Sequence, residues 1–534
     1  MSRGVTSITF LSKKAIVLLG LSILIIAQSG YAQFIPEGRY EKEVKMSDNR
    51  FMVISLKENG IALIREKNKY KDGNRLWEFI LLDQELGERW QADVEIKAGY
   101  MMIGYEYAGQ YLFGLFREGD RDSNKFILLT LHIGSYEIKQ FEIKQEFLFR
   151  PTHFTMAGEN AIFGGYVSSE PAVMLYETST QLLKVIPGFF LKDTELLDLR
   201  ANSNNTFNAL LIERNTLDKR HLVIKTFDAS GGLLLEDEIE IGKDINLLTG
   251  ISSSLKREEL ILLGTYTEGT GREALGFYSV LVDPFSDQSI NYFPFANLTH
   301  ALDYLPSKRI AKIKSKSKER MEVGKAPDYK AHVLPIRIEE TEEGFFFLSE
   351  MYDPASSTNR NTWNTYNNPY YGYGYSPYSY NPFMNRYANS PYSFNNSSQN
   401  TSAKMIESIL TLFDSKGKLI WDNSLKYENI KRYATEQISD FVIKDNLVYL
   451  AYKKESEIHV STSSLILEPE LDTVGIKLKY PSDIVRNETE DDTGIRYWYN
   501  DYSFVWGYQS IKDTDKKNED PVRYVFYINK FASE

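Results

Sequence analysis

The chain has 534 residues and a formal net charge of −11, from 62 Lys and Arg against 73 Asp and Glu, and it contains no Cys. The absence of thiols excludes disulfides, cysteine nucleophiles, zinc–cysteine sites and a lipid-modified cysteine. A chain this acidic has no global attraction for nucleic acid, because that binding needs clustered Lys and Arg. Its 36 Tyr and 30 Phe favour β-structure.

Residues 1–32 are predicted to be a signal peptide. Lys13 and Lys14 precede the apolar run 15–27, which is shorter than the about 20 residues that a membrane span requires. Small residues before Gln33 favour cleavage there. We therefore expect export to the periplasm or cell surface, as a mature chain with no transmembrane anchor and no lipid. The alternative is an uncleaved N-terminal anchor.

Strand signals are nearly continuous over residues 33–534, which we interpret as a single domain. One type of strand recurs, an apolar run bounded by turn residues, which is typical of strands covered on both faces. These runs begin near residues 61, 111, 161, 209, 260, 345, 447 and 504. The early spacing of about 50 residues is that of a four-stranded propeller blade.

A short hairpin also recurs, in which an apolar strand is followed by Asp, then Gly, then a second apolar strand. It occurs at Asp83, Asp228 and Asp414, with a looser copy at Asp283. Asp can hydrogen-bond the turn backbone, and Gly accepts the positive φ of a tight turn. The repetition of one hairpin at long intervals indicates a repeat architecture.

This layout resembles the β-propeller superfamily, with a hairpin (Asp414, Gly417, Trp421) similar to the repeat of quinoprotein-like and WD40-like propellers. The resemblance covers nearly all of the mature chain and implies an all-β fold of about eight four-stranded blades, with seven as the alternative. The last unit shows three strands, and the N-terminal strand near 39–46 is expected to supply the fourth and close the ring. No cofactor fingerprint accompanies the resemblance.

Two insertions interrupt the spacing. Residues 297–328 are expected to hold a short helix before Pro306 and then a basic tract from Lys308 to Arg320. That tract is either a solvated connector or a docking segment for an anion.

The second insertion, 354–402, is rich in Tyr and Asn and has no apolar periodicity, so we expect a disordered loop on one rim. It is either inert or an aromatic surface that stacks on sugars or a protein. The candidate binding residues in it are Tyr370, Tyr371, Tyr373, Tyr375, Tyr378 and Tyr380.

Signals for chemistry are weaker. Asp120, Asp122 and Asn124 begin like a calcium loop, but the Gly and Glu that such a loop needs at its sixth and twelfth positions are missing. The acidic stretch from Glu488 to Asp492 is interpreted as a solvated loop, with a site for calcium or a basic partner as the alternative. Four acids lie in or after strands where a blade faces a central channel: Glu106, Asp198, Glu268 and Glu350.

The sequence therefore favours an exported, non-catalytic binding or scaffold protein of the bacterial envelope, whose partner is a protein or a glycan. No cofactor is expected, apart from the weak calcium candidate. The alternative is a propeller-type glycan hydrolase or lyase with two carboxylates in the channel. A subunit of envelope machinery is the third hypothesis.

Overall fold

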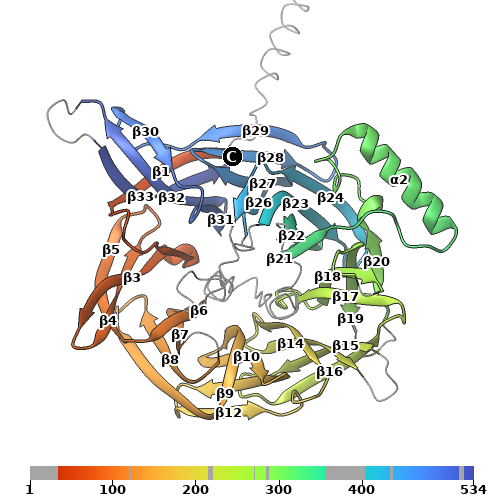
Figure 1. The fold of residues 1–534 in the computed structure, drawn as a ribbon, viewed down its shortest axis with the longest axis horizontal. Helices are drawn as coiled ribbons and strands as arrows, with labels where there is room; N and C mark the ends of the chain where they lie inside the picture. Colours follow the sequence, from red (N-terminus) through yellow and green to blue (C-terminus); the bar gives the residue numbers. More distant parts are fainter. Residues whose placement is uncertain are drawn as a thin grey trace, which may run out of the picture.

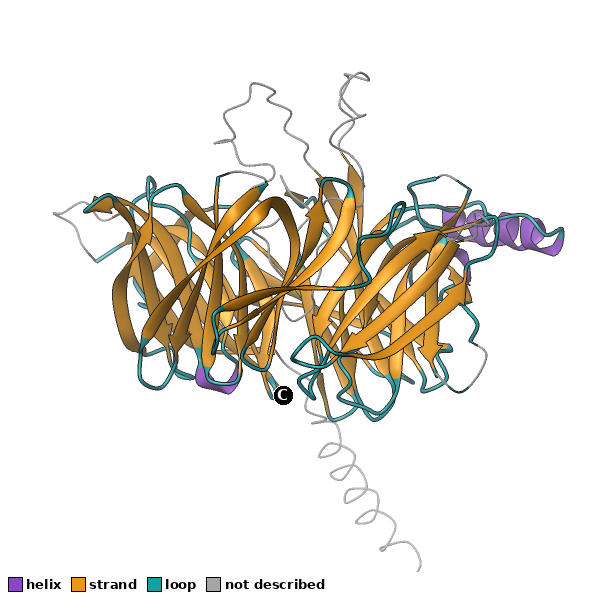
Figure 2. Ribbon diagram, turned by 90° about the horizontal axis from the view of Figure 1, so that it is seen from below, coloured by secondary structure: helices purple, strands orange, loops and turns teal. Residues whose placement is uncertain are grey.

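The computed structural model describes residues 34–119, 122–214, 220–269, 271–283, 285, 288–354, 403–432, 437–515 and 522–534. Throughout these residues the regular structure is almost all β-strand, joined into antiparallel sheets. Figure 1 shows the sheets side by side around a common centre, and Figure 2 shows their strands running between two rims. This radial arrangement is that of a β-propeller, the superfamily that the sequence resembles.

In the N-terminal half, the sheets are meanders of consecutive strands. The first is formed by β2 (Met52–Ser55), β3 (Ile61–Lys71), β4 (Asn74–Leu82) and β5 (Glu88–Lys97). The second contains β6 (Tyr100–Ala108), β7 (Tyr111–Glu118), β8 (Ser123–His132), β9 (Ile138–Ala157), β10 (Asn160–Val167), β11 (Glu170–Glu177) and β12 (Leu182–Ile186). Because β9 pairs with β8 through its first part and with β10 through its second, this sheet consists of two groups of four strands that share β9.

The remaining sheets repeat the same pattern. One is formed by β13 (Glu195–Ala201), β14 (Phe207–Arg214), β15 (Arg220–Phe227) and β16 (Leu233–Glu240), and the next by β17 (Ile245–Ser252), β18 (Leu260–Glu268), β19 (Gly276–Val282) and β20 (Asn291–Pro294). The following sheet contains β21 (His332–Glu340), β22 (Phe345–Pro354), β23 (Ala403–Phe413), β24 (Leu419–Lys426) and the short β25 (Lys431–Arg432). The last of these is formed by β26 (Ser439–Lys444), β27 (Leu447–Lys454), β28 (Glu457–Ser463) and β29 (Glu470–Gly475). Two single turns of 3-10 helix are η1 (Lys57–Asn59) and η2 (Phe295–Asn297).

The last sheet joins the two ends of the described chain. It contains β30 (Asp483–Glu488), β31 (Gly494–Tyr499), β32 (Tyr502–Asp513), β33 (Val522–Ser533) and β1 (Phe34–Glu43). β1 pairs antiparallel with β33, with Phe34 opposite Ser533. The expected pairing of the first and last strands is therefore present. β30 and β31 lie one after the other along the same edge of β32.

The recurring apolar runs are the second strands of the four-stranded groups, as predicted: β3, β7, β10, β14, β18, β22, β27 and β32. All but the last residue of β18 is buried, whereas the outermost strand β29 is mostly exposed. A second strand has a neighbouring strand on each side and a neighbouring sheet on each face, so it can be apolar throughout.

Apolar clusters fill the spaces between successive sheets. Trp77 of the first sheet packs edge-on against Phe116 of the second, with ring centroids 5.1 Å apart. The terminal sheet packs on both sides: Phe526 lies against Phe51, the residue before β2, and Val505 shares a cluster with Tyr449 of β27. Each cluster shields two sheets from water at once.

The Asp hairpins have the predicted geometry, with one correction. In each, one carboxylate oxygen of Asp83, Asp228 or Asp414 accepts two backbone N–H groups at 2.7–2.9 Å. Gly417 has the expected positive φ of 71°. In the first copy the prediction was wrong, because Leu86 takes the positive φ. Leu86 is buried in the core, which offsets the strain of that conformation.

The predicted helix before Pro306 was also wrong. The described chain has α2 instead at Ser307–Glu322, after Pro306, and the basic tract forms it. Pro has a fixed φ and no N–H to donate, which suits the start of a helix, and Lys and Arg are good helix formers. Ile310 and Ile313 pack against the core between the β17 and β21 sheets. Figure 1 shows α2 on the outside of the ring.

Candidate functional site

The inner strands of neighbouring sheets are joined by charged side chains. Arg337 of β21 donates to Asp440 of β26 from Nε at 2.8 Å, and to the carbonyl of Phe441 at 2.8 Å. The other carboxylate oxygen of Asp440 accepts the backbone N–H of Tyr497 in β31 at 2.9 Å. One carboxylate thus connects three successive sheets near the centre of the ring.

Charged side chains also join β21 to the sheet on its other side. Glu340 accepts the backbone N–H of Ser254 at 2.6 Å and that of Arg257 at 2.9 Å, both in the turn after β17. Lys256 pairs with Glu339 at 2.8 Å. These contacts hold the β17 sheet to the β21 sheet.

Asp198, one of the predicted channel acids, also makes a charged contact between two neighbouring sheets. It lies in β13 and accepts the backbone N–H of Ser252 in β17 at 3.0 Å, while Arg200 pairs with it at 3.2 Å. Burial raises the pKa of the Asp198 carboxyl, and Arg200 opposes that shift. The Asp198 side chain is 1% exposed and its hydrogen bonds join two sheets, so its role is to hold those sheets together.

Glu350 is the most densely bonded of the predicted acids. It lies in β22, and its Oε1 accepts from Tyr427 Oη, just after β24, at 2.9 Å. The same oxygen accepts the N–H groups of Ile438 and Ser439, at the start of β26, each at 2.8 Å. Burial raises its pKa to about 7, and these hydrogen bonds oppose the shift. The carboxyl can therefore exchange a proton near neutral pH, but its side chain has no exposed surface.

A second buried acid, Glu407, lies on the neighbouring strand β23, opposite Met351 of β22. It is fully buried, and burial raises its pKa well above the ordinary value, with Ser424 opposing the shift. Its surroundings include the loop before α2, because Asp303 and the backbone of Tyr304 act on it. The sequence reasoning missed Glu407, whose only signal is an acid inside an apolar run.

The four predicted acids do not share one sheet. Glu106, Asp198, Glu268 and Glu350 lie in β6, β13, β18 and β22, and all but Glu268 are buried. Hydrolysis by two carboxylates needs the pair to face one substrate within roughly 10 Å. Asp198 and Glu350 instead make their hydrogen bonds in separate seams between sheets.

The acidic stretch begins at Glu488, the last residue of β30, and the prediction that it is solvated was wrong for this residue. The Glu488 side chain is 3% exposed and pairs with the buried Lys453 at 2.5 Å. It also accepts from Tyr527 Oη at 2.6 Å and from Gln509 at 2.8 Å. Burial lowers the pKa of Lys453, and Glu488 opposes that change. This network ties β27 to the terminal sheet.

The calcium candidates remain a prediction. Asp120 lies outside the described residues, Asn124 is half-buried in β8, and Asp122 is paired with Arg150 at 2.8 Å. That guanidinium would compete with a cation for the carboxylate. Over the described ranges, no group of three or more His, Asp or Glu side chains is placed to hold a metal.

The six candidate tyrosines between Tyr370 and Tyr380 also lie outside the described residues. The strands that lead into and out of their segment are described. β22 and β23 remain paired as far as the last residue of β22 and the first residue of β23, with Pro354 directly opposite Ala403. The segment therefore starts and ends at adjacent points.

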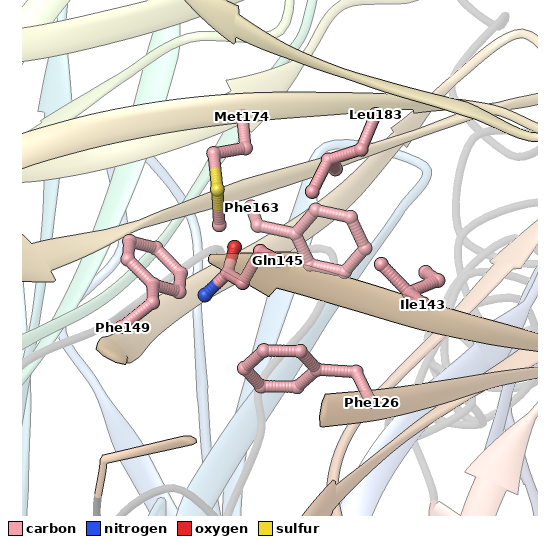
Figure 3. A pocket seen from close by; sticks show the side chains of 7 residues that line it. All are labelled: Phe126, Ile143, Gln145, Phe149, Phe163, Met174 and Leu183. Atoms are coloured by element: carbon pink, nitrogen blue, oxygen red, sulfur yellow. The ribbon is translucent and has the colours of Figure 1, made fainter. Parts of the chain in front are cut away.

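One gap in the packing lies between β8, β9, β10, β11 and β12 (Figure 3). It is lined by Phe126, Ile143, Gln145, Phe149, Phe163, Met174 and Leu183. The gap is too narrow to hold a water molecule, and Gln145 is its single polar side chain. It is a packing defect beside the part of β9 where the strand passes from one group of strands to the next.

No protein-family model and no curated protein matches the sequence. Solved structures similar to the chain include the β-propeller domain of the Trilobed protease from Pyrococcus furiosus, with a TM-score of 0.33, 9% identity, and coverage of 77% of this chain and 94% of that one. Polysaccharide lyase Uly1 has a TM-score of 0.34 and 7% identity, with coverage of 93% and 99%. Prolyl oligopeptidase B from Galerina marginata has a TM-score of 0.39 and 8% identity, with coverage of 96% and 61%. Across the described residues, no helix is long and apolar enough to span a membrane.

Proposed function

We propose that the chain is an exported β-propeller that binds a protein or glycan of the bacterial envelope and acts as a scaffold. In this proposal eight blades form a ring closed by the pairing of β1 with β33. Two observations support the ring: the strand pairing itself, and the apolar clusters on both sides of the terminal sheet. Export is proposed from the predicted signal peptide at residues 1–32.

The observation that carries the binding function is the ladder between β22 and β23. It runs to Pro354 and Ala403, so 48 residues rich in Tyr and Asn leave and rejoin the sheet at one place. Such a segment can be long without straining the sheet. Tyr combines a flat apolar face with a hydroxyl group, which suits both sugars and protein surfaces.

A glycan hydrolase or lyase is the second candidate, and Glu350 is the observation that favours it. A carboxyl with a pKa of about 7 is suited to general acid–base catalysis. However, Glu350 is completely buried and hydrogen-bonded to Tyr427 and Ser439, so a substrate cannot reach its carboxyl group. We therefore favour binding over catalysis.

The test uses the full chain and two variants. In one, an Asn-Gly turn replaces residues 355–402; in the other, Ser replaces the six tyrosines Tyr370, Tyr371, Tyr373, Tyr375, Tyr378 and Tyr380. We expect both variants to fold and to lose binding to the envelope glycans or cross-linked neighbours that the unaltered chain binds. Unchanged binding in both variants would contradict the proposal.

The same samples test the enzymatic alternative. Each envelope glycan is incubated with the unaltered chain and with Glu350→Gln, and new reducing ends or unsaturated sugars are measured. Cleavage that requires Glu350 would establish the second candidate in place of the first. Binding without cleavage is the expected result.

A further inference from the structure

Helix α2 carries a concentration of positive charge on an acidic protein. Its 16 residues hold seven basic and two acidic side chains, a net charge of +5, whereas the whole chain has −11. The rest of the chain therefore carries −16. Figures 1 and 2 show the helix on the outer wall, projecting away from the sheets.

The inward face of the helix is occupied. Ile310 and Ile313 pack against the core, and the buried Ser317 accepts the backbone N–H of Asp328 at 3.1 Å. Arg320 donates to the carbonyl of Ala326 at 2.6 Å. Lys314 is half-buried and donates to the carbonyl of Thr299 at 3.2 Å. These contacts fix the rotation of α2, so the other five basic side chains are held outward.

The outward face consists of Lys308, Arg309, Lys312, Lys316 and Lys318, all exposed. Lys316 pairs with Asp328 at 2.7 Å. Within the described chain, the other four make no ion pair within 4.0 Å. From Lys308 to Lys318 the helix rises about 15 Å, so these charges form an extended row and do not converge on one small anion.

The shape and charge of the surroundings restrict the partner. The rest of the chain carries a net charge of −16, which opposes the approach of a broad anionic surface such as a membrane. A narrow chain can follow α2 and avoid the body. Recognition of a sugar chain generally uses aromatic stacking, and the five outward residues include no aromatic side chain. An acidic polypeptide needs only the charges that this face offers.

We propose that the outward face of α2 binds an acidic polypeptide segment, a run of Asp and Glu on a partner protein. This site is separate from the tyrosine segment of the proposed function, and its binding is driven by charge. It should therefore weaken as salt screens the interaction.

The test is fluorescence anisotropy of a labelled peptide of about eight glutamates, which is longer than the 15 Å row when extended. The full chain is compared with a triple variant, Lys308→Glu, Lys312→Glu and Lys318→Glu. We expect binding by the unaltered chain at low salt, a marked loss at about 0.3 M salt, and at least about tenfold weaker binding by the variant. Equal thermal unfolding of both proteins shows that the variant is folded.

The matched control reverses the charge of three exposed lysines outside α2, Lys97→Glu, Lys192→Glu and Lys243→Glu, and so has the same change in net charge. It should bind the peptide within about twofold of the unaltered chain. An equal loss in the control, or no loss in the α2 variant, would overturn the proposal. So would failure of the unaltered chain to bind the peptide.

Two further probes separate the classes of partner. Phosphatidylglycerol vesicles and an alginate oligosaccharide carry negative charge on a lipid surface and on a sugar chain. Tighter binding of either probe than of the peptide would overturn the choice of a polypeptide. The variant lacking residues 355–402 should bind the peptide normally, so a failure of the proposed function does not remove this site.

Discussion

Phe34 and Phe531 stack on one another, with ring centroids 5.0 Å apart and planes inclined by 12°. One residue begins the first strand and the other lies in the last strand, so this contact joins the two ends of the described chain. Both rings are buried in the cluster between the β26 sheet and the terminal sheet.

We expect Phe34→Ala to lower the free energy of unfolding by about 3–5 kcal/mol, because it leaves a cavity where the chain ends meet. Chemical denaturation of the purified chain measures the change. Phe285→Ala is the control, since that ring is 96% exposed, and its effect should stay within about 0.5 kcal/mol. Equal effects of the two changes would mean that the Phe34 ring contributes nothing measurable to stability.

The Asp turns yield a second prediction. Asp414→Ala removes the acceptor of the Lys416 and Lys418 N–H groups and should cost about 1–2 kcal/mol, measured by chemical denaturation. Lys416→Ala removes an exposed side chain from the same turn and should have little effect. Asp414→Asn should recover part of the loss, because its carbonyl oxygen can accept the same hydrogen bonds. An unchanged free energy of unfolding in Asp414→Ala would show that Gly417 maintains the turn without the Asp side chain.

A third prediction concerns a glycine in a second strand. A Cβ on Gly264 would lie 2.1 Å from the carbonyl oxygen of Thr249, at the register shift between β17 and β18. A backbone carbonyl within paired strands cannot move aside to relieve the clash, as a flexible side chain could. Gly264→Ala should therefore destabilise the protein by at least about 2 kcal/mol. Gly475→Ala in the outer strand β29 meets nothing within 4 Å and should be tolerated. Thermal unfolding of the two variants makes the comparison, and similar unfolding temperatures would contradict it.

The fourth prediction is a pH dependence caused by Glu350. Burial raises the pKa of this carboxyl from 4.5 to about 7 in the folded protein. Between these values the folded state holds a proton that the unfolded state has released, so stability falls as the pH rises through this window. The expected loss from Glu350 is about 3 kcal/mol, and it is complete above about pH 7.

Glu350→Gln should reduce the difference in unfolding free energy between about pH 5 and pH 8 by that amount. Some slope should remain, because burial also raises the pKa of Glu407. Glu343→Gln, at an exposed position, is the matched control for the Glu-to-Gln change itself. If the Gln variant keeps the full slope, Glu350 is not the group that titrates.

The repeat was predictable because it depends on local chemistry. Apolar runs such as β18 and turns such as that at Asp414 are visible in the sequence, and their spacing indicates blades. Leu86 escaped prediction because its positive φ is tolerated only through burial against a distant sheet. The position of α2 was missed because its apolar contacts, at Ile310 and Ile313, are few among many lysines.

The candidate site was less predictable, for the same reason. Glu350 was identified as one acid among 73, but its partners Tyr427 and Ser439 belong to later parts of the chain. Glu488 looked like a surface residue in a charged stretch, yet Lys453 and Tyr527 enclose it.

The order of amino acids by itself determined that this protein is built from repeated β-hairpins, because turn geometry and strand burial depend on residues only a few positions apart. The tertiary structure alone decided which acids became clamps between sheets and which basic side chains face solvent. A pKa, an ion pair or an exposed helix face depends on neighbours that are distant in the chain, and only the packed sheets bring those neighbours together.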